Sequence, residues 1–86
     1  MTGRFCVRAQ DGELCEVYKM TSPRVAVTHV PGGDYRIVIW DDNNRMNIRT
    51  IGVYKSEQLT RRVLNAITWA INHMPFRIFR VPLEEE

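Results

Sequence analysis

The chain has 86 residues, of which 44% are apolar, 26% charged and 9% aromatic. This length excludes a second hydrophobic core and this composition excludes wholesale disorder, so we expect one folded domain over residues 1–83. No apolar run approaches the roughly 18 residues that span a membrane, and the start lacks the apolar stretch of a signal peptide, so we expect a cytoplasmic protein without a membrane partner.

The charge is unevenly distributed, because residues 84–86 form an acidic tail that we expect to fray. The chain has 12 basic and 10 acidic side chains, a net charge of +2, and without the three acids of the tail 12 against 7 gives +5. Most of the bases are arginine, whose planar fork suits carboxylates, phosphates and aromatic rings. The body therefore either binds an anionic partner, nucleic acid or an acidic protein surface, or uses arginine only for solubility.

The first predicted element is a hairpin with the two-residue turn Asp11-Gly12, because glycine accepts the positive φ of a type I′ turn. This register places Cys6 and Cys15 as diagonal neighbours on the outer face, too far apart for a disulfide, and Val17 falls on that face too. We expect two free, half-exposed thiols, whose spacing matches no zinc signature. The expected core face carries Phe5, Val7, Ala9, Leu14, Tyr18 and Met20. Glu16 is the one charged residue that this register places on the same face.

Three further strands are predicted at residues 24–30, 35–40 and 45–54, separated by a type II turn at Pro31-Gly32 and a turn at residues 41–44. Centring the second turn on Asp42-Asn43 divides the last two of these strands into two faces. The apolar face carries Tyr35, Ile37, Ile39, Met46, Ile48 and Thr50. The opposite face carries Arg36, Val38, Trp40, Arg45, Asn47 and Arg49.

A helix is predicted from about Glu57 to Met74, with Ser56 as N-cap and Pro75 as its end. Its apolar stripe consists of Leu59, Val63, Ala66, Ile67, Ala70, Ile71 and Met74. A last strand follows at residues 76–81, with either Phe76 and Ile78 or Phe79 and Val81 turned inward. The pattern predicts an α+β fold, in which an antiparallel sheet of five to six strands carries the helix on one face and leaves the other face open.

The sequence offers little for catalysis, so we expect a protein that is not an enzyme and that needs no cofactor or metal. His29 lies on a strand beside valines, and His73 lies in the last helical turn, where a cation suits the helix dipole. The aspartates fall in turns, and no glycine-rich loop, nucleophile motif or metal motif occurs.

Two groups of side chains are candidates for binding a partner. The open sheet face is predicted to carry Arg36, Trp40, Arg45 and Arg49, a set that suits a protein partner or single-stranded nucleic acid, unless it is only a solvated face. On the helix flank, Arg62 and Trp69 have the composition of an interface hot spot, unless Trp69 folds down over the sheet edge.

A small domain that begins at Met1, with hairpins at Asp11-Gly12 and residues 41–44 and then a helix from Ser56, resembles small phage and mobile-element proteins, among them the anti-CRISPR inhibitors. The resemblance covers size and layout and carries over no functional residue. It implies a non-enzymatic protein that blocks a larger nucleoprotein complex by stoichiometric binding. Inhibitors that mimic DNA are typically acidic, whereas the body of this chain has a net charge of +5. The charge therefore does not fit DNA mimicry.

We therefore expect a protein-binding module of this inhibitor kind, and as the alternative a small basic domain that binds nucleic acid through the open sheet face. An exposed edge strand at residues 24–30 also makes a homodimer a candidate assembly.

Overall fold

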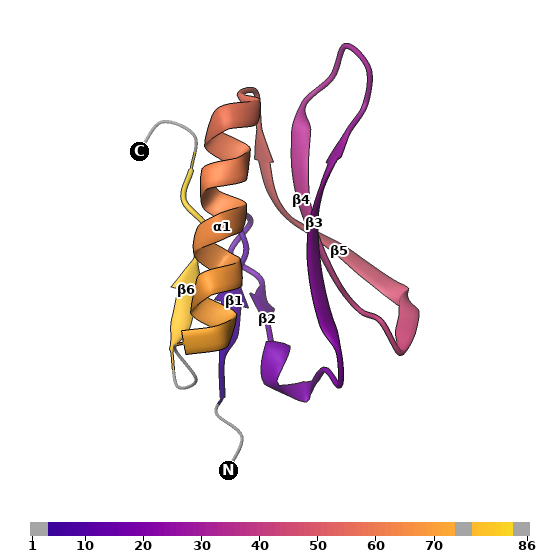
Figure 1. Ribbon diagram of the computed structural model, residues 1–86, viewed down its shortest axis with the longest axis vertical. Helices are drawn as coiled ribbons and strands as arrows, with labels where there is room; N and C mark the ends of the chain where they lie inside the picture. The colour runs from indigo at the N-terminus through magenta and orange to yellow at the C-terminus, as the bar shows by residue number, and fades with distance from the viewer. Residues whose placement is uncertain (1–3, 74–76, 84–86) are drawn as a thin grey trace.

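Six strands and one α-helix make up the described part of the chain, residues 4–73 and 77–83 of a computed structural model, so the α+β class is confirmed. The side chains of residues 45 and 46 also lie outside the described part. The elements shown in Figure 1 are β1 (Cys6–Arg8), β2 (Leu14–Cys15), the 3₁₀ turn η1 (Val17–Lys19), β3 (Pro23–His29), β4 (Tyr35–Asp41), β5 (Asn44–Tyr54), α1 (Glu57–His73) and β6 (Ile78–Arg80).

The strands form two three-stranded sheets, which corrects the expectation of a single antiparallel sheet. The β1 sheet has the order β2-β1-β6 and the β4 sheet has the order β3-β4-β5. The first hairpin stays apart from β3 because the chain turns into η1 after Cys15 instead of continuing as a strand. The chain returns along α1 and then places β6 parallel to β1, with Val7 opposite Phe79.

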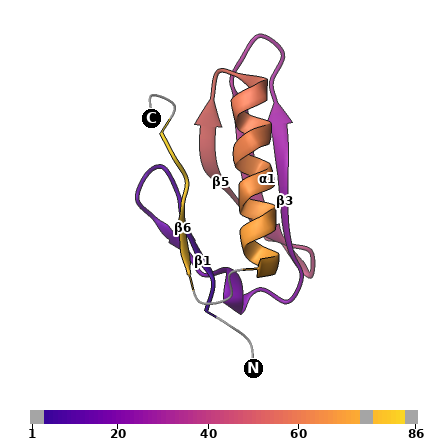
Figure 2. The ribbon, with the colours of Figure 1, turned by 60° about the vertical axis from the view of Figure 1, so that its left-hand side comes forward.

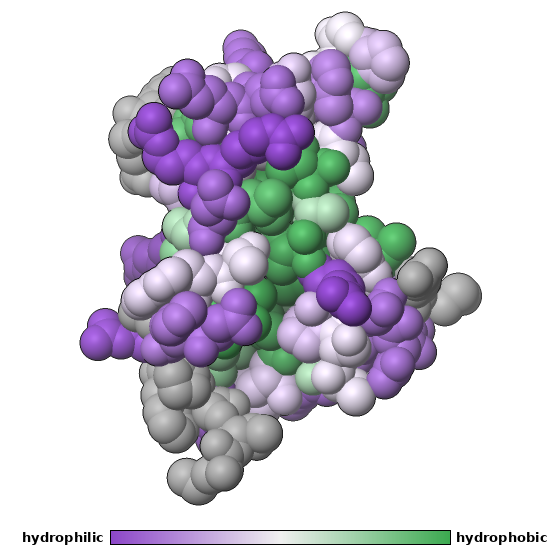
Figure 3. All heavy atoms as spheres, in the orientation of Figure 1, coloured by the Kyte–Doolittle hydropathy of each residue, from purple (hydrophilic) through white to green (hydrophobic). Residues whose placement is uncertain are grey.

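The core lies between α1, the β1 sheet and the face of the β4 sheet that is turned toward α1, which we call the inner face (Figure 2). Val7, Ile37, Ile39 and Ile67 are fully buried there, and Tyr54 is nearly so. In the view of Figure 1, apolar side chains also reach the surface as a band between α1 and the β4 sheet (Figure 3).

Gln10 joins the two sheets through its backbone and its side-chain amide. Its backbone N–H donates to the Ile51 carbonyl over 3.0 Å, and its side-chain oxygen accepts from the Val53 N–H at 2.8 Å. Its side-chain nitrogen donates to the Pro82 carbonyl at 2.9 Å, and the Tyr54 hydroxyl donates to the same carbonyl. These bonds fix β5 against the segment that follows β6.

The first hairpin has a three-residue loop at residues 10–12, so the predicted two-residue turn is wrong by one residue. Gly12 has a φ of +90°, and its N–H donates to the Ala9 carbonyl. This is the type I turn with a glycine bulge that three-residue hairpin loops adopt. The observed register pairs Val7 with Cys15. It therefore exchanges the faces of the second strand, so that Cys15 and Val17 are buried and Leu14 is exposed.

The second hairpin has the predicted Asp42-Asn43 turn, but its register does not continue as predicted. Asp41 pairs with Asn44, and a regular ladder would then pair Ile39 with residue 46. Ile39 instead pairs with Arg49. A second irregularity, between Ile37 and Val38, leaves Ile51 as an extra residue in β5. The second irregularity is a β-bulge, whereas the first sets Trp40 alone against residues 45–48 of β5. Both insert an odd number of residues into β5 and therefore change the face that later side chains occupy.

Gly52 follows this second bulge and lies where β5 meets the segment after β6. A Cβ atom at Gly52 would be 3.0 Å from the Val81 Cγ1 atom and 3.1 Å from the ring of Tyr54. These contacts are tighter than most Cβ contacts, so a side chain at this position would require Val81 and Tyr54 to shift by a few tenths of an ångström.

The helix matches the prediction closely, except at one buried position. Ser56 caps it, because its Oγ accepts from the Leu59 N–H at 3.2 Å. Thr60 is fully buried although the predicted stripe omits it, and its hydroxyl donates to the Ser56 carbonyl. Ala66 is exposed although the stripe includes it, and Met74 lies outside the described residues.

Strand β6 ends at Arg80, one residue before the end of the predicted strand. Val81, which follows it, is buried and Ile78 is exposed, which confirms the second of the two predicted alternatives. Phe76 and the tail at residues 84–86 lie outside the described residues. Among the residues that are described, no helix is long and apolar enough to cross a membrane.

Candidate functional site

The face of the β4 sheet that points away from α1 is the main candidate site, and we call it the open face. The register of β3, β4 and β5 assigns side chains to it, because residues paired across strands share a face. Its members are Arg24, Ala26, Thr28, Arg36, Val38, Trp40, Ile48, Thr50 and Val53. Most of these side chains are apolar, and the expectation of an arginine-covered face is therefore wrong.

A shallow depression of about 350 Å³ lies in this face, and we call it the hollow. Its lining consists of Ala26, Thr28, Val38, Trp40 and Ile48. Ile48 is 57% exposed, whereas Trp40 and Val38 are half-buried. A concave apolar surface with an aromatic wall is the shape that receives a large apolar side chain of a partner.

Only part of the predicted sheet site is brought together. Arg36 and Trp40 share the open face as predicted, and Arg24 lies opposite Trp40 on β3. Arg49 is on the inner face, because it pairs with the buried Ile39. The side chain of Arg45 lies outside the described part of the chain.

The helix flank is a separate surface, because α1 covers the inner face and the hollow lies on the other side of the sheet. Arg62 and Trp69 are exposed there, and Trp69 is 55% exposed. The Trp69 ring stacks on His73, with ring centroids 4.6 Å apart, so it does not fold over the sheet edge. The two predicted groups therefore form two surfaces and not one site.

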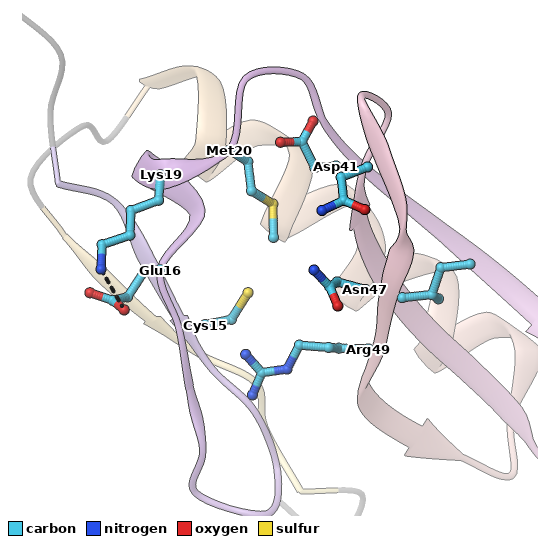
Figure 4. A pocket seen from close by; sticks show the side chains of 9 residues that line it. Cys15, Glu16, Lys19, Met20, Asp41, Asn47 and Arg49 are labelled. Carbon is cyan, nitrogen blue, oxygen red and sulfur yellow. Dashed lines mark hydrogen bonds and ion pairs between the residues drawn. The ribbon is translucent and has the colours of Figure 1, made fainter.

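A polar cavity of about 590 Å³ lies between the two sheets (Figure 4). Arg49, which the sequence predicted on the open face, lines this cavity. The Arg49 guanidinium points toward the Cys15 sulfur in this view and makes an ion pair with Glu13 at 3.2 Å. Asp41, on the opposite wall, accepts from the backbone N–H groups of Thr21 and Ser22. Its lining consists of Cys15, Glu16, Lys19, Met20, Asp41, Asn44, Asn47, Ile48 and Arg49.

Burial and hydrogen bonds shift the pKa values of the groups in and near this cavity. Burial raises the pKa of the Cys15 thiol above its ordinary 9.0, and the Arg49 guanidinium opposes only part of that rise. Burial likewise raises the pKa of Cys6. Both thiols are free and buried and stay protonated at neutral pH, so they are poor nucleophiles. Backbone hydrogen bonds lower the pKa of Asp41, and the bond from the Thr21 N–H has the largest effect. The Asp41 carboxylate thus accepts hydrogen bonds from the turns on either side of it.

The two histidines have ring contacts that account for their positions. His29 stacks on Tyr35 with centroids 4.0 Å apart, and His73 stacks on Trp69. Within residues 4–73 and 77–83, no group of three His, Cys, Asp or Glu side chains is arranged to hold a metal ion.

The raised thiol pKa values predict a loss of stability in alkali. The unfolded thiols release protons near pH 9 and the folded thiols do so at higher pH, so the contribution of the thiols to the free energy of unfolding is constant well below pH 9 and falls above it. Urea titrations at pH 7, 9 and 10 measure this fall. The Cys15→Ala variant should show a shallower fall than the wild type, and an equally steep one would contradict the assignment.

Comparison of the chain with protein-family models, curated proteins and solved structures gives no match.

The sequence reasoning missed Ala26, Thr28 and Ile48 as parts of the hollow. Ala26 and Thr28 alternate with the valines of β3, and this signal was present in the sequence. Ile48 had no such signal, because only the irregular pairing of β5 turns it to the open face.

Proposed function

We propose that this protein is a non-enzymatic protein-binding module and that its open face docks the partner. The observation that carries the proposal is the hollow, in which Trp40 forms one wall of an uncovered apolar depression. Tryptophan and arginine are the residues most enriched at the energetic centres of interfaces, and Arg36 lies on the same face.

The proposal extends to a mode of action. Binding that covers this sheet face would block a larger nucleoprotein complex by stoichiometric occlusion, as in the anti-CRISPR inhibitors that the chain resembles in size and layout. A cytoplasmic location belongs to the same proposal, because free thiols such as Cys6 and Cys15 persist in a reducing compartment.

Nucleic-acid binding is the alternative, and one observation favours it. Arg24 and Arg36 flank the hollow, so an aromatic ring and two guanidinium groups share one face. The ion pair between Arg24 and Asp42, at 3.8 Å, reduces the charge available for phosphates. We favour the protein partner because the hollow itself is lined mainly by aliphatic side chains.

The test is affinity capture from host lysate with Trp40→Ala compared with Trp69→Ala. Both tryptophans are at least partly exposed and lie on opposite sides of the β4 sheet, which makes them a matched pair. A partner recovered in stoichiometric amount should be lost at least about tenfold with Trp40→Ala and kept with Trp69→Ala. Equal recovery with both variants, or loss with Trp69→Ala alone, would refute the open face as the docking surface.

A binding assay with oligonucleotides tests the nucleic-acid alternative. Binding of random single strands that weakens by orders of magnitude between about 50 and 200 mM salt would replace the protein-binding proposal with the nucleic-acid one.

A further inference from the structure

Strand β3 is an unusually regular edge of the β4 sheet. Its seven residues, Pro23–His29, pair with β4 without a bulge, in contrast to the two irregularities between β4 and β5. In Figure 1 it is the strand nearest the viewer, and in Figure 2 it forms the outer border of the sheet. Among the described residues, no hydrogen bond reaches its outer edge. Natural proteins usually protect such an edge with a bulge, a lysine or a covering segment.

The backbone groups that face this free edge follow from one hydrogen bond. The Asp42 N–H donates to the Ser22 carbonyl at 2.9 Å, which continues the β3–β4 ladder by one pair. Because hydrogen-bonded pairs alternate along an antiparallel ladder, the even-numbered residues of β3 bond to β4. Val25, Val27 and His29 therefore direct their N–H and carbonyl groups outward, whereas Pro23 offers a carbonyl alone.

Concave surfaces adjoin this edge on both sides of the sheet. On the inner side lies a groove of about 280 Å³ with a mixed lining of Pro23, Arg24 and Val25 from β3 and Thr68, Ile71 and Asn72 from α1. On the other side, Ala26 and Thr28 form part of the hollow. The apolar band in Figure 3 lies between α1 and the β4 sheet, where β3 is foremost. A strand added to β3 would cover the apolar hollow on one face and this groove of mixed polarity on the other.

The sequence of β3 is complementary to itself when two copies run antiparallel about an axis at Ala26. This register overlaps the whole strand and sets Val25 opposite Val27 of the second copy. Each of these two valines then donates its N–H to the carbonyl of the other. Arg24 falls opposite Thr28 of the second copy rather than opposite a second arginine, so no like charges meet directly. The residue at the axis is alanine, which is small enough for the close approach of a non-hydrogen-bonded pair.

The other sheet edges fit this role less well. Strand β2 has two residues and β6 has three, whereas β3 has seven. The free side of β5 is partly used by Gln10, which bonds to the Ile51 carbonyl and the Val53 N–H.

We propose that two copies of this chain associate through β3 in antiparallel register, with Ala26 at the two-fold axis, to form a six-stranded sheet. The hollows of the two copies then lie on one continuous open face. This inference is independent of the proposed partner, because a dimer forms with or without one.

Light scattering on the purified chain tests the assembly, and a pair of lysine variants tests the strand. We expect a dimer mass at high concentration that falls toward the monomer over roughly a hundredfold dilution. Ala26→Lys puts two ammonium groups face to face at the axis and should give a monomer. Thr50→Lys places the same charge on the open face of β5, away from the edge, and should leave the dimer intact. Circular dichroism confirms that both variants fold.

Cysteine crosslinking with diamide tests the register, since the native thiols are buried. Ala26→Cys should form a disulfide-linked dimer, because its two copies face each other across the axis. Thr28→Cys should not, because its two copies lie four positions apart along the strands, roughly 13 Å. A monomer at every concentration would overturn the proposal. So would a dimer in which Thr28→Cys crosslinks and Ala26→Cys does not.

Discussion

Replacing Ile39 with alanine should lower the free energy of unfolding by about 3 kcal/mol, whereas replacing Ile48 with alanine should change it by less than about 0.5 kcal/mol. Both residues are isoleucines in strands of the β4 sheet. Ile39 is fully buried on the inner face, and its truncation leaves a cavity. Ile48 is 57% exposed at the margin of the hollow, and its truncation removes apolar surface that already meets water.

Urea unfolding followed by circular dichroism measures both values under the same conditions. The sequence register predicts the two isoleucines on one buried face, and it therefore predicts similar, large losses. Comparable losses in the two variants would show that the irregular β4–β5 pairing is wrong. If Ile39→Ala does not fold well enough to measure, Ile39→Val should still cost about 1 kcal/mol, which remains larger than the Ile48→Ala effect.

The sequence predicted the elements whose signals are local. Ser56 and Glu57 mark the start of the helix, and its spacing of apolar residues predicted most of the buried side. The predicted end at Pro75 lies outside the described residues. The type II turn was readable because proline precedes glycine, and Gly32 has the expected positive φ of +76°. In each case the signal lies within a few residues of the feature that it specifies.

The registers depend on distant contacts, so the local signals of the sequence did not specify them fully. The extra residue of β5 at Ile51 accompanies the packing of Gly52 against Val81, some thirty residues later in the chain. The loop of the first hairpin includes Gln10, which is held by β5 and by Pro82. A pattern read strand by strand contains neither of these partners.

The shifted registers change the character of the candidate site. A continuous register would gather Arg36, Arg45 and Arg49 around Trp40 and create a basic surface. The observed pairing moves Arg49 to the inter-sheet cavity and brings Ile48 to the open face. The site thereby gains an apolar centre, and the proposal of a protein partner rests on that observation.

The first hairpin contained a sign that its predicted register was wrong. Glu16 was placed among core residues, and a shift of one residue moves it to the surface, where it bonds to Tyr18 and pairs with Lys19 at 3.3 Å. The same shift buries Val17 and exposes Leu14. A single charged misfit on an otherwise apolar face was therefore stronger information than the preference of Asp-Gly for a two-residue turn.

The shifted register also predicts a large difference in the free energy of unfolding between the variants Val17→Asp and Leu14→Asp. Val17 is 4% exposed within the core, so a carboxylate there loses its hydration without gaining a partner, and we expect a loss of about 4 kcal/mol in the free energy of unfolding. Leu14 is 38% exposed at the edge of the β1 sheet, and its replacement should cost less than about 1 kcal/mol.

Urea unfolding at neutral pH compares the two aspartate variants, and Val17→Ala provides a milder probe of the same position. Val17→Ala should cost about 2 kcal/mol, which keeps the comparison measurable if Val17→Asp is unfolded from the outset. The predicted two-residue turn requires the opposite order, with Leu14 the sensitive position, because it buries Leu14 and exposes Val17. The order of the two positions therefore decides the register of the hairpin, and with it whether Cys15 faces Arg49 across the inter-sheet cavity.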